Sequence, residues 1–274
     1  MKGSRARSFA VNAALAALSA VTLLPLAWMA SVSLMAPGES NTFPPPLVPA
    51  SPTLANYREL LGADGIVRPA LNTLGLAVGA TLLSLTFNVA AGYAFAKLRF
   101  AGRERIFKAL LGALVIPAQV TMMPLFLMLK YMGLVNTYVG ALVPWLASVF
   151  GIFLVRQYAL SVPDELLEAA RIDGAGEMRI FATIVMPVLK PILITLGVLT
   201  FLGSWNDFMW PLIVLTDRDL HTLPLALASL SREHVQDTEM MMAGSVLTVL
   251  PVLAVFLALQ RHYMQGLLAG SVKQ

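Results

Sequence analysis

The sequence predicts an all-α membrane protein that crosses the bilayer six times. Its 274 residues are 58% hydrophobic and only 12% charged, with a mean hydropathy of +0.76, far from the balance of a soluble chain. The apolar residues gather into stretches of the roughly 20 residues that a helix needs to cross about 30 Å of hydrocarbon. Six such stretches occur, at about 9–35, 69–96, 109–129, 137–155, 191–216 and 240–260.

The composition also excludes several kinds of site. The chain has no cysteine, which removes disulfides, thiolate-bound zinc and iron–sulfur clusters. Its histidines, His221, His234 and His262, are scattered, so we expect no metal site. Since no nucleophile–base pair occurs in the apolar stretches, we expect no catalytic residue, and a membrane-embedded enzyme is disfavoured.

The first apolar stretch follows three basic residues, Lys2, Arg5 and Arg7, as a secretory signal peptide does. Its uncharged run continues from Ser8 to Gly38, however, far beyond the short apolar region of a signal peptide. We therefore expect a retained membrane anchor and a single transmembrane domain over residues 1–274.

The distribution of basic residues predicts the topology. With the N-terminus in the cytoplasm, the inner segments hold fourteen Lys and Arg residues and the outer segments hold five. Basic residues near span ends resist translocation, so this asymmetry favours cytoplasmic N- and C-termini. The basic excess follows from topology, and we expect no nucleic-acid partner. Five basic residues in one inner segment are expected at anionic headgroups: Lys97, Arg99, Arg103, Arg105 and Lys108.

Proline and glycine mark irregular points within the spans. Pro117 and Pro124 each remove a helical hydrogen bond from the third span, so we expect a kinked or interrupted helix there. Gly75 and Gly79 form a GxxxG pair in the second span, which fits either a close helix–helix approach or ordinary lipid-facing sequence.

A polar segment at 156–190 stands out between the fourth and fifth spans. It carries nine charged residues, whereas 131–155 and 191–206 carry none. Ser161 and Asp164 resemble a capping box that opens a helix over 164–172, and Gly174 suits its end. A second helix is expected to begin near Gly176 and to reach Pro187.

The first of these helices has an apolar face and an acidic polar side. Leu166, Ala169 and Ala170 recur at the spacing of one face, with Glu165 and Glu168 beside them. A helix that rests on anionic lipid is usually rich in Lys and Arg on its polar side. The acidic excess therefore favours a groove on a protein partner.

The same segment resembles the EAA motif of ABC importer permeases. The sequence EAARIDGAGEMRIFATIVMPVLKP matches this motif. Three further segments, AGYAFAK at 91–97, WNDFMWPL at 205–212 and the tail at 264–273, resemble the carbohydrate-uptake branch of the family and its smaller maltose-type subunit with six spans. The resemblance covers nearly the whole chain. It implies the type I ABC importer permease fold, located in the bacterial inner membrane.

The resemblance also implies partners and roles. In that family the motif is a coupling helix that docks on a separate nucleotide-binding subunit. No phosphate-binding G-x-x-x-x-G-K-[ST] loop occurs in this sequence, so ATP and Mg are expected on two copies of a partner ATPase, and no cofactor on this chain. A second permease subunit and an extracytoplasmic binding protein, received by the face that carries 36–68 and 217–239, are also implied. The coupling residues carried over are Asp164, Glu165, Leu166, Glu168, Ala169, Ala170, Asp173, Gly174 and Ala175.

Polar residues in the fifth span form a second candidate site. Asn206 and Asp207 lie beside Trp205, and an intramembrane carboxylate is a candidate functional group. Aromatic faces can stack on sugars, while amide and carboxylate groups bind hydroxyls. A structural bond to a neighbouring span, or to backbone freed near Pro211, is the equal alternative.

These observations together predict import of a sugar, such as a di- or oligosaccharide, driven by ATP on another subunit. A glycerol-phosphate or polyol permease is the first alternative, although no basic residue lies inside the spans to meet a phosphate. A proton-coupled secondary transporter that uses Asp207 is the second, and such proteins usually carry two internal repeats, which we do not find.

Overall fold

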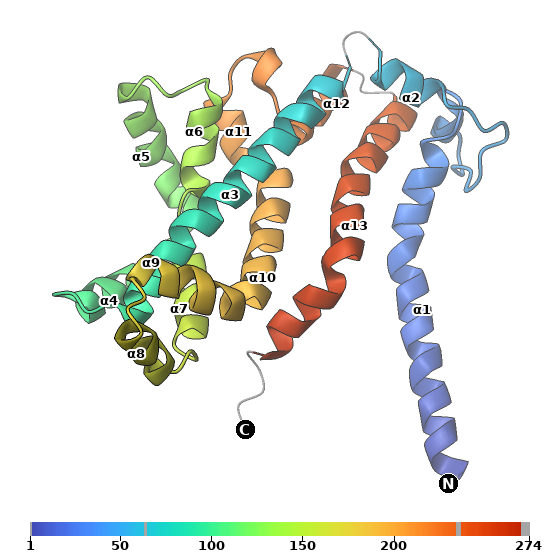
Figure 1. Cartoon of the computed structure of the whole chain (residues 1–274). Helices are drawn as coiled ribbons and strands as arrows, with labels where there is room; N and C mark the ends of the chain where they lie inside the picture. Colours follow the sequence, from blue (N-terminus) through green and yellow to red (C-terminus); the bar gives the residue numbers. More distant parts are fainter. Residues whose placement is uncertain (1, 63–64, 234–236, 270–274) are drawn as a thin grey trace. The chain divides into compact units, whose positions relative to one another are not determined.

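The computed structural model describes residues 2–62, 65–233 and 237–269, and within these ranges it contains helices and no strands (Figure 1). The all-α prediction is confirmed. The chain divides into two compact units, one of residues 1–68 with 226–251 and one of residues 69–225 with 252–274.

Six membrane crossings are consistent with the helices. Four single helices are long and apolar enough to span, within α1 (Lys2–Val32), within α3 (Val67–Lys97), over Glu177–Trp205 and within α13 (Thr238–Ala269). Two bent pairs supply the remaining two spans, α4 (Arg103–Ala113) with α5 (Ala118–Tyr131), and Tyr138–Trp145 with α7 (Val149–Ala159).

The first unit ties an extended outer segment to the end of α1. After α1 the chain runs through a short 3-10 turn, Glu39–Asn41, to α2 (Ala55–Leu60). The buried Asn56 amide donates to the carbonyl oxygens of Ser33 and Met35 at 3.0 and 2.9 Å. The Ser40 N–H donates to the buried Glu239 carboxylate of α13 at 2.7 Å. These bonds hold the segment in one path.

The second unit has its core where α3, α7 and the helix that leads into α10 (Met186–Trp205) meet. Val89, Tyr93, Val155 and Leu189 belong to this buried cluster. Gly92 of α3 allows the close contact with α7, because a Cβ atom there would lie 2.6 Å from the Cβ of Val155. The GxxxG pair has no such role. A Cβ on Gly75 would meet nothing within 4 Å, and one on Gly79 would make ordinary contact with Leu142.

The interruption expected in the third span is found at Pro117. Helix α4 ends at Ala113, the chain turns through Leu114–Pro117, and α5 begins at Ala118 at 106° to α4. Pro117 has an extended ψ of 136° and stands as the N-cap of α5. Pro124 lies inside α5 without ending it.

The fourth span is broken as well, which the sequence did not predict. The α6 segment (Tyr138–Leu142) and a 3-10 turn at Val143–Trp145 end before α7, and the two halves are bent by 46°. The Ser148 N–H at this break donates to the buried Asn88 side chain of α3 at 2.9 Å, and Asn88 donates to Ser84 at 2.7 Å. Asn88 therefore satisfies backbone that the break leaves unpaired.

The fifth span also differs from expectation at both ends. Helix α9 (Glu177–Ile180) continues through a π-helical segment, Phe181–Val185, into α10, so no helix ends at Pro187. Pro187 falls in the first turn of α10, where its missing N–H is tolerated. Helix α10 ends at Trp205, short of residue 216, and a separate helix α11 (Met209–Val214) follows.

Candidate functional site

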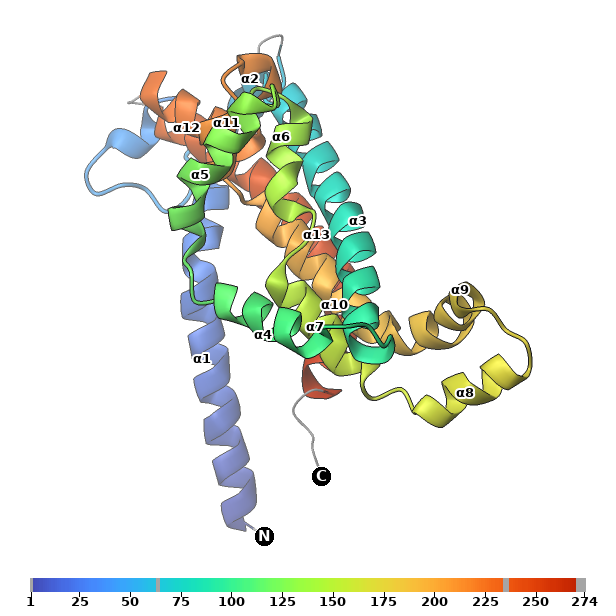
Figure 2. The ribbon, with the colours of Figure 1, turned by 90° about the vertical axis from the view of Figure 1, so that its left-hand side faces the viewer.

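Helix α8 (Asp164–Ile172) and the start of α9 form a hairpin at the end of the second unit where α3 and α7 terminate. Figure 2 shows this hairpin projecting to one side of α7 and α10. The predicted helix over 164–172 is confirmed.

The inner face of α8 fixes the helix to the core. Leu167 is only 1% exposed and belongs to the cluster that includes Val162, Ile180 and Val185. Ala170 and Ala175 pack against the same cluster. Since Ala170 is turned inward, the predicted apolar face of Leu166, Ala169 and Ala170 is divided between two sides of the helix.

The outer face of α8 exposes large apolar side chains. Leu166 is about half exposed, Ile172 is 87% exposed, and Met178 of α9 is also exposed. Ala169, Glu165 and Glu168 are exposed on the same helix. The sequence analysis missed Ile172 and Met178, although the 166–169–172 spacing places Ile172 near Leu166.

The first turn of α8 is fixed by a lysine from another helix. The predicted capping box is wrong, because Ser161 donates to the Tyr158 carbonyl at 2.7 Å and the N-cap position is Pro163. Lys97, the last residue of α3, donates instead to the Val162 carbonyl and to the Asp164 carboxylate, both at 2.6 Å. The hydrogen bond and charge of Lys97 hold the pKa of Asp164 below its ordinary value.

The last turn of α8 ends in a Schellman motif, as the glycine predicted. Gly174 has φ +81°, its N–H donates to the Arg171 carbonyl, and the Ala175 N–H donates to the Ala170 carbonyl. Arg171 also forms a two-pronged ion pair with Glu177 at 2.6 and 3.3 Å, which bridges α8 and α9. This hydrogen bond raises the pKa of Arg171.

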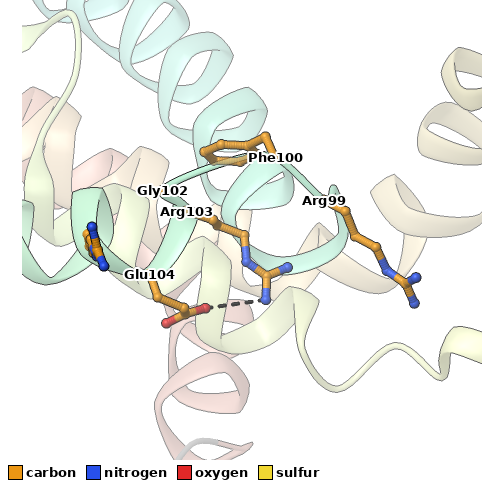
Figure 3. A pocket seen from close by; sticks show the side chains of 6 residues that line it. Arg99, Phe100, Gly102, Arg103 and Glu104 are labelled. Carbon is orange, nitrogen blue, oxygen red and sulfur yellow. Dashed lines mark ion pairs between the residues drawn. The ribbon is translucent and has the colours of Figure 1, made fainter.

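The basic segment between α3 and α4 is divided between two environments. The Lys97 side chain is only 4% exposed and forms an ion pair with Asp164. Its predicted position at lipid headgroups is therefore wrong. The next part of the chain lines an open pocket of about 510 Å³ with Arg99, Phe100 and residues 102–105 (Figure 3). There Arg103 reaches Glu104 at 3.3 Å, while Arg99 extends away from that pair.

The pathway residues lie at the break between α10 and α11. Trp205 is buried and stacks on Phe201, with 5.7 Å between ring centroids. Asn206 is exposed, and its amide donates to the Leu202 carbonyl at 2.8 Å. Asp207 accepts from the Trp210 N–H at 3.3 Å, so the carboxylate caps the first turn of α11. The three side chains therefore make separate contacts, one with a ring, one with a carbonyl group and one with a backbone N–H.

Helix α11 is held in place from the opposite side by Trp210 and Asn136. The Trp210 indole donates to the Gly140 carbonyl at 3.1 Å. Asn136, at φ 60°, accepts from the Thr216 and Asp217 N–H groups at 3.0 and 2.9 Å. The break at residues 206–208 is thus a fixed feature. Within the described residues, no group of three or more acidic or histidine side chains is placed to hold a metal.

These features define a class: a polytopic helical membrane protein with broken spans and a helix hairpin presented at one end. A family model described as "Binding-protein-dependent transport system inner membrane component" matches residues 88–268. The chain belongs to that family, and it is an inner-membrane permease subunit of a binding-protein-dependent transport system.

Individual relatives agree with this assignment. The arabinooligosaccharide transport system permease protein of Halalkalibacterium halodurans is 36% identical over 97% of this chain and 94% of its own. The sn-glycerol-3-phosphate transport system permease protein of Pectobacterium atrosepticum is 34% identical over 82% of this chain and 83% of its own. A chain in the crystal structure of a bacterial ABC transporter involved in import of the polysaccharide alginate has a TM-score of 0.85, at 23% identity, over 96% and 98% of the two chains.

The fold likeness confirms the ABC importer permease fold, and the family confirms location in the inner membrane and dependence on a substrate-binding protein. Because the family comprises transport components, the enzyme and secondary-transporter alternatives lose their support.

Proposed function

We propose that this chain forms part of the membrane pathway of an ATP-driven sugar importer and receives the force for transport through α8. Two copies of a separate ATPase subunit, a second permease subunit and an extracytoplasmic binding protein complete the assembly. ATP and Mg are bound by the ATPase subunits, and this chain carries no catalytic residue.

The observation that carries the proposal is the division of α8 into two faces. Leu167 and Ala170 fix the helix to the core of the second unit, while Leu166, Ala169 and Ile172 remain exposed. Both ends are tied, by Lys97 at the first turn and by the Gly174 cap and the Arg171–Glu177 pair at the last. A helix held in this way transmits displacement, and the exposed apolar face suits a groove on a partner.

The acidic residues extend this surface. Glu165, Glu168 and Asp173 are exposed beside the apolar residues, so the groove on the ATPase subunit is expected to offer basic or hydrogen-bond donor groups. Asp164, Gly174 and Ala175 belong to the ends of the helix, and we assign them to its positioning.

The test of coupling is ATP hydrolysis by the purified assembly in lipid vesicles, with binding protein and substrate added. Glu168→Lys and Ile172→Glu are expected to abolish substrate-stimulated hydrolysis while the permease remains inserted. Lys108→Glu, a charge reversal on the exposed side of α4, is the matched control and should retain stimulation. Normal stimulation in both α8 variants would refute the proposal.

Sugar is favoured as the substrate class because the arabinooligosaccharide permease of Halalkalibacterium halodurans is similar over 97% of this chain, and the six apolar stretches of the sequence offer no basic residue to a phosphate group. The glycerol-phosphate relative keeps a second candidate open. The two are separated by the stimulation of hydrolysis by oligosaccharides or by glycerol 3-phosphate, each with the cognate binding protein.

Asn206 and Asp207 enter the proposal as residues that shape the pathway at the α10–α11 break. Asp207 acts by capping α11, and Asn206, which is exposed at the break, is the residue placed to meet substrate. Trp205 is buried against Phe201 and supports the end of α10.

A further inference from the structure

The segment that follows α1 in the first unit carries an uncharged, proline-rich tip. Between Glu39 and Arg58 no residue is charged. Phe43 is 98% exposed, and Leu47 and Val48 are each 73% exposed. Three large apolar side chains thus stand in the open within six residues of chain.

Hydrogen bonds to α1 fix the depth of this tip. The Trp28 indole donates to the Pro46 carbonyl at 3.4 Å, and the Ser31 hydroxyl donates to the Leu47 carbonyl at 2.6 Å. Both donors lie in the final turn or so of α1, so the segment folds back along the helix instead of continuing outward. Figure 1 shows the loop turning back beside the end of α1.

The length of the first span allows the depth of Trp28, and of the tip bonded to it, to be estimated relative to the bilayer. The apolar span Arg7–Val32 has 26 residues, which is about 39 Å at roughly 1.5 Å per residue. The hydrocarbon core is about 30 Å thick, so a centred helix extends about 4–5 Å beyond it on each side. Trp28 is four residues from the end, or about 6 Å, which places it at the boundary where Trp side chains concentrate.

The backbone of the tip suits that boundary. Residues 44, 45, 46, 49 and 52 are all proline and have no N–H group to leave unpaired in a poorly hydrated layer. Two of the carbonyl groups accept from Trp28 and Ser31, and the Ala50 N–H donates to Glu39 at 2.6 Å. The prolines therefore reduce the number of N–H groups in the tip, and two of its carbonyl groups are bonded to α1.

We propose that residues 43–48 form an interfacial anchor that inserts Phe43, Leu47 and Val48 into the outer leaflet of the membrane. The occupant of this surface is lipid at the level of the headgroup–acyl boundary. The anchor fixes the outer end of α1 against the bilayer.

The absence of cysteine in the chain allows a direct test. Single variants Phe43→Cys, Leu47→Cys and Val48→Cys carry a nitroxide label in the full chain with its co-purifying subunits, in vesicles of phosphatidylethanolamine and phosphatidylglycerol. Collision with oxygen, which concentrates in lipid, is compared with collision with a water-soluble nickel chelate. The matched control is Leu61→Cys, an exposed apolar position after α2.

The anchor predicts labels at 43, 47 and 48 that are accessible to oxygen and shielded from the nickel chelate, and a control label that is open to the chelate. Labels that are open to the chelate at all three tip positions would overturn the proposal. Shielding that arises only on addition of the binding protein would overturn it as well and would assign the tip to that protein.

Discussion

A single buried polar residue satisfies the backbone at the break of the fourth span. Asn88 lies in the middle of α3 and is fully buried, with one bond to Ser84 and one from the Ser148 N–H of the broken fourth span. A buried amide that satisfies freed backbone has no apolar substitute, because a hydrophobic residue leaves the Ser148 N–H without a partner.

Asn88→Leu is therefore expected to lower the free energy of unfolding by about 1–3 kcal/mol, the cost of an unpaired buried donor. Thermal unfolding of the purified chain in detergent measures the change. Thr86→Leu is the matched control, since Thr86 is exposed on the same helix and its hydroxyl bonds only the Leu82 carbonyl. An equal loss in both variants would contradict the role given to Asn88.

The Lys97–Asp164 pair gives a residue-level prediction for pH. The pKa of Asp164 is lowered in the folded chain, so the bond to Lys97 contributes above the pKa of an unfolded aspartate, about 3.9, and is lost only as the pH falls through the lowered value. Amide hydrogen exchange in the hydrogen-bonded turns of α8 that follow Asp164, corrected for intrinsic rates, should stay slow from about pH 8 to about pH 5. Lys97→Ala should speed this exchange at neutral pH, whereas Lys108→Ala should not.

At the scale of elements, α8 depends on the left-handed backbone at its end. Gly174 has φ +81°, and a Cβ atom there would meet nothing within 4 Å, so a substitution acts through backbone strain and not through a clash. Gly174→Val is expected to cost about 1–3 kcal/mol locally and to fray α8. Substrate-stimulated ATP hydrolysis should fall in this variant and be largely retained in Gly174→Asn, because Asn tolerates this conformation.

The packing of α3 against α7 gives a second prediction for a glycine, in which a steric clash and not backbone strain causes the destabilisation. Gly92 lies against Val155 of α7, where a Cβ would approach to 2.6 Å, whereas Gly75 faces open space. Gly92→Val should overpack the α3–α7 contact by about 1–3 kcal/mol or more. Gly75→Val is the control and should leave thermal stability within the experimental error. Equal melting temperatures for the two variants would contradict the packing described.

The elements also show what sequence could and could not predict. The apolar stretches and the polar segment at 156–190 predicted the helices, and Gly174 predicted the end of α8. These signals are local in the sequence. A bond to backbone freed near Pro211 was one of the alternatives drawn from the sequence, and Asp207 makes such a bond at the break over 206–208. The roles of Lys97 and Asn88 were missed, since each depends on a partner far away in the chain. The capping box failed because Lys97 supplied a stronger partner for Asp164 than the helix N-terminus did.

For the whole molecule, the charge asymmetry predicts cytoplasmic N- and C-termini, and the cysteine-free chain allows a direct test of that topology. Ala101→Cys and Gly176→Cys lie at exposed positions of inner segments, and Met132→Cys and Thr216→Cys at exposed positions of outer ones. A membrane-impermeant maleimide should label the outer pair in right-side-out vesicles and the inner pair only after inversion or permeabilisation. Because a single crossing, the broken fourth span, separates residue 132 from residue 176, the two must lie on opposite sides of the membrane. Labelling of both from one face would refute the six-span arrangement and, with it, the cytoplasmic position of α8.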